Sequence, residues 1–341
     1  MGKKVVHYLK LYEELEKRII SGIWSGKLPS QSQLINEFQV SHNTNKKVLD
    51  QLKTDGLVTG HQGKGVYVVE RKAAPSSTVG LWIPNFGLLE VPFFARVTAS
   101  VRAELARHKA EAEFFTDLEQ AHNQHYCGLL LFGASPDNMD MEKFAAGFNG
   151  NIIQVNNNHL PNLPAVFSSN LRCGYLAIEH LYKAGHRNIA VFTRETYMVN
   201  KLFFYRWKGA EKFADQHPDV KLFKTEVEPQ NPSPAARTAV GKLLDNAHDI
   251  TAIFAFNDVI ALGVLSALQQ RQLRVPDDIS LISVDNRDFS SVTNPPLTTF
   301  NEDAEQIGKS AVAMLYNEIT DCRKLAVEPH LIERASVKNI N

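Results

Sequence analysis

From residue 78 onward, short apolar runs alternate with longer amphipathic segments, and this pattern leaves few folds open. The runs at 79–83 and 128–132 have the length and composition of strands buried on both faces of a sheet. The alternation predicts the α/β class, a mostly parallel, doubly wound sheet with helices on both faces. Further strands are predicted at 113–117, 152–155, 188–192, 252–256 and 279–284, and helices at 92–108, 176–184, 205–217, 235–246, 259–271 and 302–320.

Polar residues that follow the predicted strands are candidate ligand contacts, because doubly wound sheets bind ligands outside the carboxyl ends of their strands. Their donors and acceptors have little general-base character and suit hydrogen bonding to a polyol, on whose apolar face an aromatic ring can stack. Asp and Asn also cap helices in such places, and paired phenylalanines also form plain core, so both interpretations stand. The candidate effector contacts are Phe93, Phe94, Asp117, Arg206, Asn257 and Asp285.

Upstream, residues 28–69 predict a helix-turn-helix followed by a hairpin wing. Ser30 and Gln33 have the spacing of a capping box for the first of these helices. Ser41 is a suitable N-cap for the second helix, and Gly56 suits the left-handed residue that ends it. A preceding helix is predicted at 6–21, and two short apolar runs around a glycine-containing turn at 61–65 predict the hairpin.

The polar side of the second helix has the chemistry to read base edges in the major groove, and the wing glycines permit close approach to a DNA backbone. A small helical domain with a solvated polar face is the alternative. The predicted DNA contacts are Ser30, Ser32, Ser41, His42, Asn43, Thr44, Lys46 and Lys47, with Gln62, Gly63 and Lys64 at the tip of the wing.

The formal charge is zero overall but is unevenly distributed along the chain. Residues 1–72 hold 12 basic and 7 acidic residues, a balance of +5, and the remaining 25 basic and 30 acidic residues give −5. A basic head on an acidic body is typical of a DNA-binding domain joined to a separate sensor. We therefore predict a head at 1–70, a polar, proline-containing linker at 71–78 and a body at 79–341.

The number and spacing of the cysteines, together with the hydropathy of the sequence, indicate the cellular compartment of the protein. Cys127, Cys173 and Cys322 are far apart and have no metal-ligand spacing, which fits a reducing cytosol, and no signal peptide is predicted. An apolar run of about 18 residues, the length of a membrane span, is lacking in the sequence. We expect a cytoplasmic protein without a membrane partner and without a cofactor or metal.

Over residues 8–69 the sequence resembles the GntR-type winged helix. The matching runs are 28–30, 38–41, 56–58 and 62–68, with Leu34, Leu49 and Leu52. The family usually has arginine at the positions of Ser32 and His42, whereas Lys46 keeps the charge of a third family arginine. Asn45 stands where an apolar residue is usual, on the side of the second helix that faces the core. The resemblance implies DNA binding, and the departures leave the operator sequence open.

Over residues 79–333 the sequence resembles the effector domain of LacI/GalR-type repressors, which is itself like periplasmic sugar-binding proteins. The matching runs are 92–94, 177–181, 185–190, 206–209, 252–258, 275–280 and 295–299. The resemblance implies two lobes joined by three crossings, with the effector in the cleft between them. Arg206, Asn257 and Asp285 match the family's effector contacts by position, and Phe93 matches an aromatic that stacks on the effector.

Three departures prevent transfer of the effector's identity. About ten residues separate Asp117 from Gly128, so the second helix of the first lobe is expected to be shortened or lost. Asn286 replaces a usual aspartate, and Ser169 replaces another near the first crossing. The linker also lacks the hinge helix of LacI-type repressors. A GntR-type head on a LacI-type body is the design of the arabinose-repressor family, a likeness of architecture that does not identify arabinose as effector.

These patterns predict a two-lobed, doubly wound, periplasmic-binding-protein-like domain preceded by a small winged helix-turn-helix domain. The expected function is a homodimeric regulator, most simply a repressor, that binds double-stranded operator DNA under the control of a small-molecule effector, a sugar in the first instance. One alternative is that the effector is a nucleobase or nucleoside. Another is that the protein is a solute-binding module without DNA regulation. His125, His180 and His186 form no recognisable catalytic arrangement with the acidic residues, so an enzyme is not expected.

Overall fold

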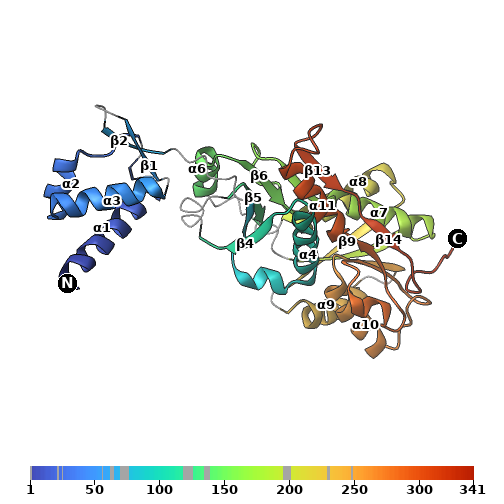
Figure 1. The fold of residues 1–341 in the computed structure, drawn as a ribbon. Helices are drawn as coiled ribbons and strands as arrows, with labels where there is room; N and C mark the ends of the chain where they lie inside the picture. The colour runs from blue at the N-terminus through green and yellow to red at the C-terminus, as the bar shows by residue number, and fades with distance from the viewer. Residues whose placement is uncertain are drawn as a thin grey trace. The chain divides into compact units, whose positions relative to one another are not determined.

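The structure is a computed structural model, and its two compact units are a head within Met1–Ser76 and a body made of Ser77–His122 and Tyr126–Asn341 (Figure 1). No helix among the described residues is long and apolar enough to cross a membrane. The structure describes residues 2–20, 23–24, 26–55, 57–61, 65–69, 77–117, 126–133, 139–194, 201–228, 231–246 and 249–341.

The head contains the predicted helix-turn-helix and hairpin. Its elements are α1 (Gly2–Ile20), α2 (Gln31–Phe38), α3 (His42–Thr54) and the antiparallel strands β1 (Val58–His61) and β2 (Gly65–Val68). Leu15, Leu34 and Leu52 are fully buried, one from each helix, and they fix how the three helices pack. The first helix begins earlier than the predicted residue 6, and Gly56 and the linker positions 70–76 lie outside the described residues.

Both predicted helix caps are present. The Ser30 hydroxyl accepts from the Gln33 amide at 3.3 Å, and the Gln33 side chain accepts from the Ser30 amide at 2.8 Å, which completes the capping box. Ser41 Oγ accepts from the Thr44 amide at 3.2 Å. These bonds satisfy amide donors that a helix start otherwise leaves unpaired, and they fix the turn between α2 and α3.

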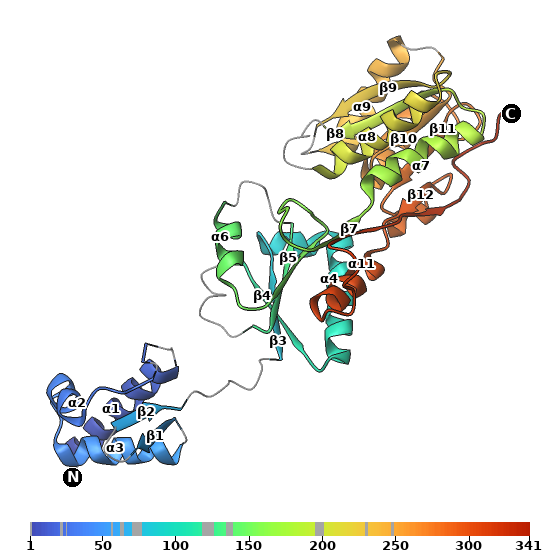
Figure 2. The ribbon, with the colours of Figure 1, turned by 90° about the horizontal axis from the view of Figure 1, so that it is seen from above.

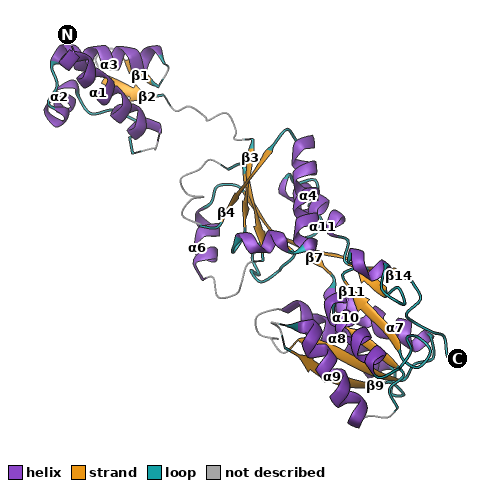
Figure 3. Ribbon diagram, turned by 90° about the horizontal axis from the view of Figure 1, so that it is seen from below, coloured by secondary structure: helices purple, strands orange, loops and turns teal. Residues whose placement is uncertain are grey.

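The first lobe of the body is a parallel sheet with strand order β13-β7-β6-β5-β3-β4 in the described part of the chain. Alternate residues of its strands face opposite sides: Leu130 packs with α4 and α11, and Leu131 packs with the cluster that includes α6. Figures 2 and 3 show α4 and α11 together on one side of the sheet and α6 on the other. The elements are β3 (Thr78–Trp82), η1 (Phe86–Glu90), α4 (Pro92–Arg107), β4 (Glu111–Phe115), β5 (Gly128–Phe132), α6 (Met139–Gly147), β6 (Asn151–Val155), β7 (Ala165–Ser168), α11 (Ala304–Leu315) and β13 (Lys324–Val327).

The second lobe has strand order β14-β12-β11-β10-β8-β9, parallel except for β14. Its core is rich in aromatic side chains, with Phe192, Phe254 and Phe256 fully buried on neighbouring strands. The helices pack in the pairs α7 with α8 and α9 with α10. The elements are α7 (Asn170–Lys183), β8 (Asn188–Arg194), α8 (Lys201–Gln216), β9 (Lys221–Val227), α9 (Pro232–Asn246), β10 (Ala252–Ala255), α10 (Asp258–Gln270), β11 (Ser280–Val284), η2 (Asp288–Ser291), β12 (Thr298–Asn301) and β14 (His330–Ile332).

The chain passes between the lobes three times, as the resemblance implied. It crosses from β7 to α7 at Ser169, from β12 to α11 at 302–303, and from β13 to β14 at 328–329. Figure 2 shows β7 leading from the first lobe towards α7 of the second. The predicted fold class is therefore confirmed.

Several predicted elements need correction. β4 ends at Phe115 rather than at residue 117, because its last pair in the ladder joins Trp82 to Phe115. α11 runs from Ala304 to Leu315 rather than over 302–320, since Asp303 caps its start and Asn317 adopts a left-handed φ of 59° beyond its end. The seven-residue strand β9 and the short strands β7, β12, β13 and β14 were not predicted. The expected loss of a helix between residues 117 and 128 falls largely outside the described residues.

Candidate functional site

The head presents a polar row along α3. Ser41, His42, Asn43, Lys46 and Lys47 are exposed and Thr44 is half-buried. Ser30 and Ser32, at the start of α2, are exposed as well. The predicted contacts Gln62, Gly63 and Lys64 lie outside the described residues. The structure thus brings eight of the eleven predicted DNA contacts onto two successive helix starts and the exposed side of α3.

Asn45 lies on the opposite side of α3, in the core of the head. Its side chain is fully buried, as expected of a position where an apolar residue is usual. Neither its amide oxygen nor its amide nitrogen has a hydrogen-bond partner among the described residues. A buried amide without partners destabilises the fold, so Asn45 is a weak point beneath the polar row.

In the body, the candidate effector site is centred on Arg206 of α8, which is 3% exposed. Its Nε donates to Asn170 Oδ1 at 2.6 Å, Nη1 donates to the Phe256 carbonyl, and Nη2 pairs with Glu302 Oε1 at 2.8 Å. Burial lowers the pKa of Arg206, but the Glu302 carboxylate together with Cys173 and Asp285 outweighs that effect, so the pKa lies above its ordinary value. The guanidinium is therefore charged, buried and held in one orientation.

Two glycines bring α8 close enough for this arrangement. A Cβ on Gly174 of α7 would lie 1.9 Å from the Arg206 carbonyl oxygen, and a Cβ on Gly209 of α8 would lie 1.9 Å from the Leu171 carbonyl oxygen. The two helices therefore touch backbone to backbone at both positions, which only glycine allows. This close crossing sets Arg206 beside Asn170, the first residue of α7.

Asp285 follows β11 and has a φ of 112°, a conformation that strains any residue with a Cβ. Its carboxylate is half-buried and lies 3.4 Å from Arg287 Nε. Burial, and then the nearby Glu302 carboxylate, raise the pKa of Asp285 to about 7. From the first lobe, Arg96 of α4 approaches the Asp285 carbonyl at 3.4 Å. The loop after β11 thus holds a strained, perturbed carboxyl group, which is typical of functional sites.

The buried Asp258 supports that loop. Its carboxylate accepts from Ser283 Oγ at 2.6 Å, Thr299 Oγ1 at 2.8 Å, Ser290 Oγ at 2.9 Å and the Arg287 amide at 2.7 Å. The neighbouring Asn257 caps α10, since its Oδ1 accepts from the Ile260 amide at 2.8 Å. The capping interpretation therefore applies to Asn257.

The remaining predicted contacts belong to the first lobe. Phe93 and Phe94 are half-buried at the start of α4, pack against the first-lobe core and meet edge to face at 5.4 Å. Asp117 is exposed beyond the end of the edge strand β4. The structure thus brings together Arg206, Asp285 and the neighbourhood of Asn257.

Sequence reasoning missed Asn170 and Glu302. Glu302 directly follows β12, but the predicted helix at 302–320 included it and removed it from the search for polar residues after strands. If the short strand at Thr298–Asn301 had been predicted, Glu302 would have been included among the polar residues that follow strands. Among the residues that the structure describes, no group of three or more His, Cys, Asp or Glu side chains is placed to hold a metal ion.

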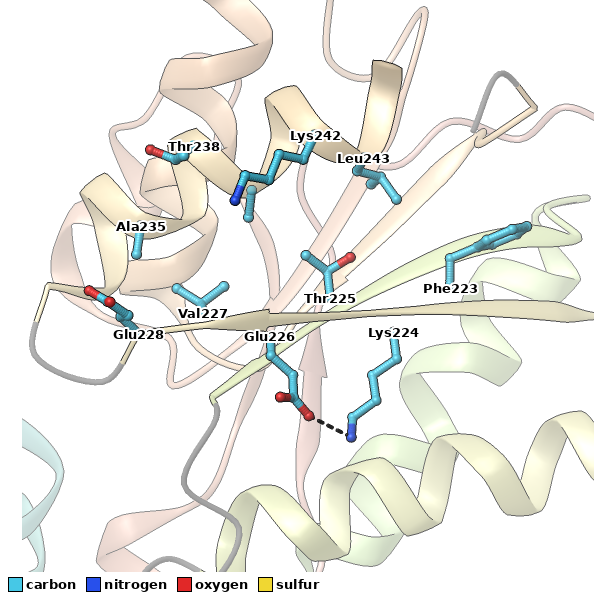
Figure 4. Close-up of a pocket in the computed structure, with 11 residues that line it drawn as sticks. Phe223, Lys224, Thr225, Glu226, Val227, Glu228, Ala235, Thr238, Lys242 and Leu243 are labelled. Carbon is cyan, nitrogen blue, oxygen red and sulfur yellow. Dashed lines mark ion pairs between the residues drawn. The ribbon is translucent and has the colours of Figure 1, made fainter. Parts of the chain in front are cut away.

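A groove of about 770 Å³ lies elsewhere in the second lobe, between the edge strand β9 and helix α9 (Figure 4). Phe223, Thr225 and Val227 point from the strand towards α9, while Lys224 and Glu226 point to the other face and pair at 2.8 Å. None of the predicted effector contacts lines this groove. Its place on a sheet edge, away from the carboxyl ends of the central strands, separates it from the Arg206 site.

Comparison with known proteins finds similar proteins for both parts of the chain. Residues 7–68 match the family described as bacterial regulatory proteins, gntR family, and residues 178–337 match the periplasmic binding protein-like domain. The arabinose metabolism transcriptional repressor of Geobacillus stearothermophilus is 26% identical over 384 residues, which cover 99% of each chain. The HTH-type transcriptional repressor PurR of Aliivibrio fischeri (strain MJ11) is 36% identical over 188 residues, which cover 52% of this chain and 54% of that repressor. The chain thus spans about half the length of the PurR relatives it matches.

Solved structures agree on the fold of the body. The transcriptional regulator CelR in complex with cellobiose has a TM-score of 0.62 at 23% identity, covering 87% of this chain and 92% of that one. A LacI family transcriptional regulator from Enterococcus faecium with bound ribose has a TM-score of 0.62 at 21% identity, covering 77% of this chain and all of the other. At these identities the likeness shows the fold alone. The relatives named here are regulators, and none is an enzyme.

Proposed function

We propose that this chain, which joins a gntR-family head to a LacI/GalR-type, periplasmic-binding-protein-like body, is a transcriptional repressor whose operator affinity is controlled by a small carbohydrate. The observation that carries the proposal is the presence, in one chain, of a capped helix-turn-helix with an exposed polar row and a sensor-type body with a buried ion pair after its strands. The full-length similarity to an arabinose metabolism repressor supports this combination.

In this proposal α3 enters the major groove and its first turn reads the bases. His42, Asn43 and Thr44 occupy that turn, and Ser41 and Ser30 cap the two helix starts that approach the DNA backbone. Lys46 and Lys47 supply exposed positive charge further along the helix. Ser32 contacts the backbone from α2, and Gln62, Gly63 and Lys64 of the wing contact the neighbouring groove.

The effector would bind between the lobes, beside Arg206 and Asp285. Arg206 has N–H donors beyond the three already used, and Asp285 and Asn257 offer acceptors and donors from two adjacent loops. Phe93, and Phe94 beside it, would stack on the apolar face of the sugar. Asp117, which is exposed, would contact the effector from the loop that follows β4.

A homodimer would present two heads to two half-sites of a near-palindromic operator. Effector binding would change the relation of the lobes and thereby the spacing of the heads. An effector shifts such an equilibrium only by its difference in affinity for the two states, so both release from DNA and corepression fit the same architecture.

The test is selection of genomic DNA fragments by the full-length protein at fixed, near-physiological salt. Enrichment of a palindromic site, together with a change in its affinity on addition of a sugar, is the expected result. Failure to enrich any fragment, with or without a sugar panel, would contradict the repressor proposal and favour a solute-binding protein without DNA regulation.

A nucleobase or nucleoside effector is the second candidate. The observation in its favour is the 36% identity to a PurR repressor, the higher of the two sequence identities given above. Titration of the operator complex with free bases, nucleosides and sugars decides between the two classes by which of them alters DNA affinity.

A further inference from the structure

Two exposed lysines of the head lie against glycines of the hairpin formed by β1 and β2. A Cβ on Gly65 would lie 2.9 Å from Lys27 Cε, and a Cβ on Gly60 would lie 3.3 Å from Lys53 Cε. The stem of each lysine therefore occupies the space that a side chain at its glycine would fill. Long cationic side chains pack their stems on a surface in this way while the charged end stays in water.

The two lysines flank the hairpin from opposite faces. Val66 is the partner of Gly60 in the antiparallel ladder and directly follows Gly65 in β2. Because cross-strand partners share a face and successive residues of a strand alternate, Gly60 and Gly65 present opposite faces. Lys27 is held on its face by a backbone bridge to Tyr67, two residues after Gly65. The hairpin thus carries one ammonium group on each side.

Lys53 also continues the polar row of α3 towards the hairpin. It follows Lys46 by seven residues, so the two lie on one side of the helix, about 10 Å apart along its axis. Asp50 lies 3.6 Å from Lys53 Nζ, but both side chains are exposed, and such a pair is weak and leaves the ammonium group available. None of the ion pairs in the described part of the head includes Lys27.

We infer that Lys27 and Lys53 bind the sugar-phosphate backbone of duplex DNA on the two sides of the hairpin, so that the base of the wing contributes to operator binding as well as its tip. The inference rests on the proposed DNA-binding function and adds two contacts to it. A hairpin tip that enters a groove has one backbone strand on each side, which is where these two ammonium groups lie. A flexible ammonium group is a point charge that binds phosphate without reading a base, so these contacts add affinity without sequence specificity.

Fluorescence anisotropy with the full-length protein tests this inference without knowledge of the operator. The probe is a labelled duplex of about 40 base pairs with mixed sequence, titrated at salt concentrations from about 50 to about 200 mM, where phosphate contacts govern binding. Lys27→Gln and Lys53→Gln should each reduce the slope of log affinity against log salt by about 0.9 and weaken binding about five- to tenfold at about 0.1 M salt. The control is Lys17→Gln, which removes the same charge from an exposed position on α1. An equal loss in all three variants would overturn the inference, because it would reflect the overall charge of the head.

The variant Gly60→Val separates the position of Lys53 from its charge. The valine side chain would fill the space that the Lys53 stem occupies, while every charge of the head is kept. We expect this variant to lower the salt slope as Lys53→Gln does, and we expect the double variant to lose no more than Lys53→Gln alone. Additive losses in the double variant would contradict the placement of Lys53 over the hairpin.

The same titrations distinguish failure of this inference from failure of the proposed function. A wild-type protein that binds no duplex at about 50 mM salt contradicts the repressor proposal and the inference with it. A wild-type protein that binds the duplex, while Lys27→Gln and Lys53→Gln keep its salt slope, overturns only the inference about the hairpin.

Discussion

Replacement of Asn45 by leucine should stabilise the head, because it removes a buried amide that has no partner in the core. An unpaired amide costs about 1–3 kcal/mol by mutational measures. Burying the leucine side chain gains about 1.5–3 kcal/mol, from which strain of about 1–3 kcal/mol is subtracted for the larger volume in a packed core. We therefore expect Asn45→Leu to raise the unfolding free energy of the head by about 2 kcal/mol, which for a domain of this size shifts its Tm upward by about 10 °C.

The assay is thermal unfolding of the full-length protein, with the head transition followed by the fluorescence of Trp24, which packs at the edge of the head core. Asn36→Leu is the control, because Asn36 is exposed on α2 and its substitution should change stability by less than about 0.5 kcal/mol. A lower Tm in Asn45→Leu would refute the reasoning, since it would mean that the amide is hydrogen-bonded in solution and contributes to the fold.

Four further predictions follow from the two candidate sites. Lys46→Ala should weaken operator binding and reduce the slope of log affinity against log salt by about 1, whereas an unchanged slope removes Lys46 from the phosphate contacts. Asp285→Ala should abolish the effector response in a gel-shift titration and leave operator binding intact; a normal response excludes Asp285 from the site. Because the folded protein holds the proton of Asp285 up to about pH 7 and the unfolded chain releases it near pH 4, wild-type unfolding free energy should fall as pH rises between these values. The variant Asp285→Asn should show a smaller decrease in unfolding free energy over the same pH range. If urea unfolding gives parallel pH profiles for the variant and the wild-type protein, this prediction is contradicted. Gly174→Ala should destabilise the body and lower effector affinity, because its Cβ would lie 1.9 Å from the Arg206 carbonyl oxygen. If calorimetry gives this variant the effector affinity of the wild-type protein, the close crossing of the two helices is dispensable.

The sequence predicted the head well because its signals are local. Ser30 with Gln33, and Ser41, fix the helix starts within a few residues of themselves, and the structure has both caps. The hairpin follows from two short runs around a turn, and its strands pair as expected. Local hydrogen bonds leave a pattern at fixed spacing, so they are legible without knowledge of the rest of the fold.

The body was predicted in outline, and most of the missed strands have a common cause. Four of the five missed strands, β7, β12, β13 and β14, have four residues or fewer, too short for periodicity to distinguish a strand from a loop. Their place is set by neighbours distant in sequence, as when β13 pairs with β7 across more than half of the body. The error at β12 then propagated to the site, because it placed Glu302 inside a predicted helix and left Arg206 without its ion partner.

The positions of the Arg206 partners connect the candidate effector site with the crossings between the lobes. Asn170 directly follows the crossing at Ser169, and Glu302 lies in the crossing between β12 and α11. A ligand that draws one Arg206 donor towards itself therefore changes the hydrogen bonding of two of the three segments about which the lobes can turn. The head precedes β3 of the first lobe in the chain, whereas Arg206 belongs to the second lobe, and the three crossings are the covalent connections between these lobes. Coupling between two sites in proteins is typically about 1–3 kcal/mol, a size that the gain or loss of one charge-assisted hydrogen bond can supply. If Arg206 acts in this way, Asn170→Ala should reduce the effect of a bound sugar on operator affinity while the sugar itself still binds; loss of both together would place Asn170 in the binding site alone.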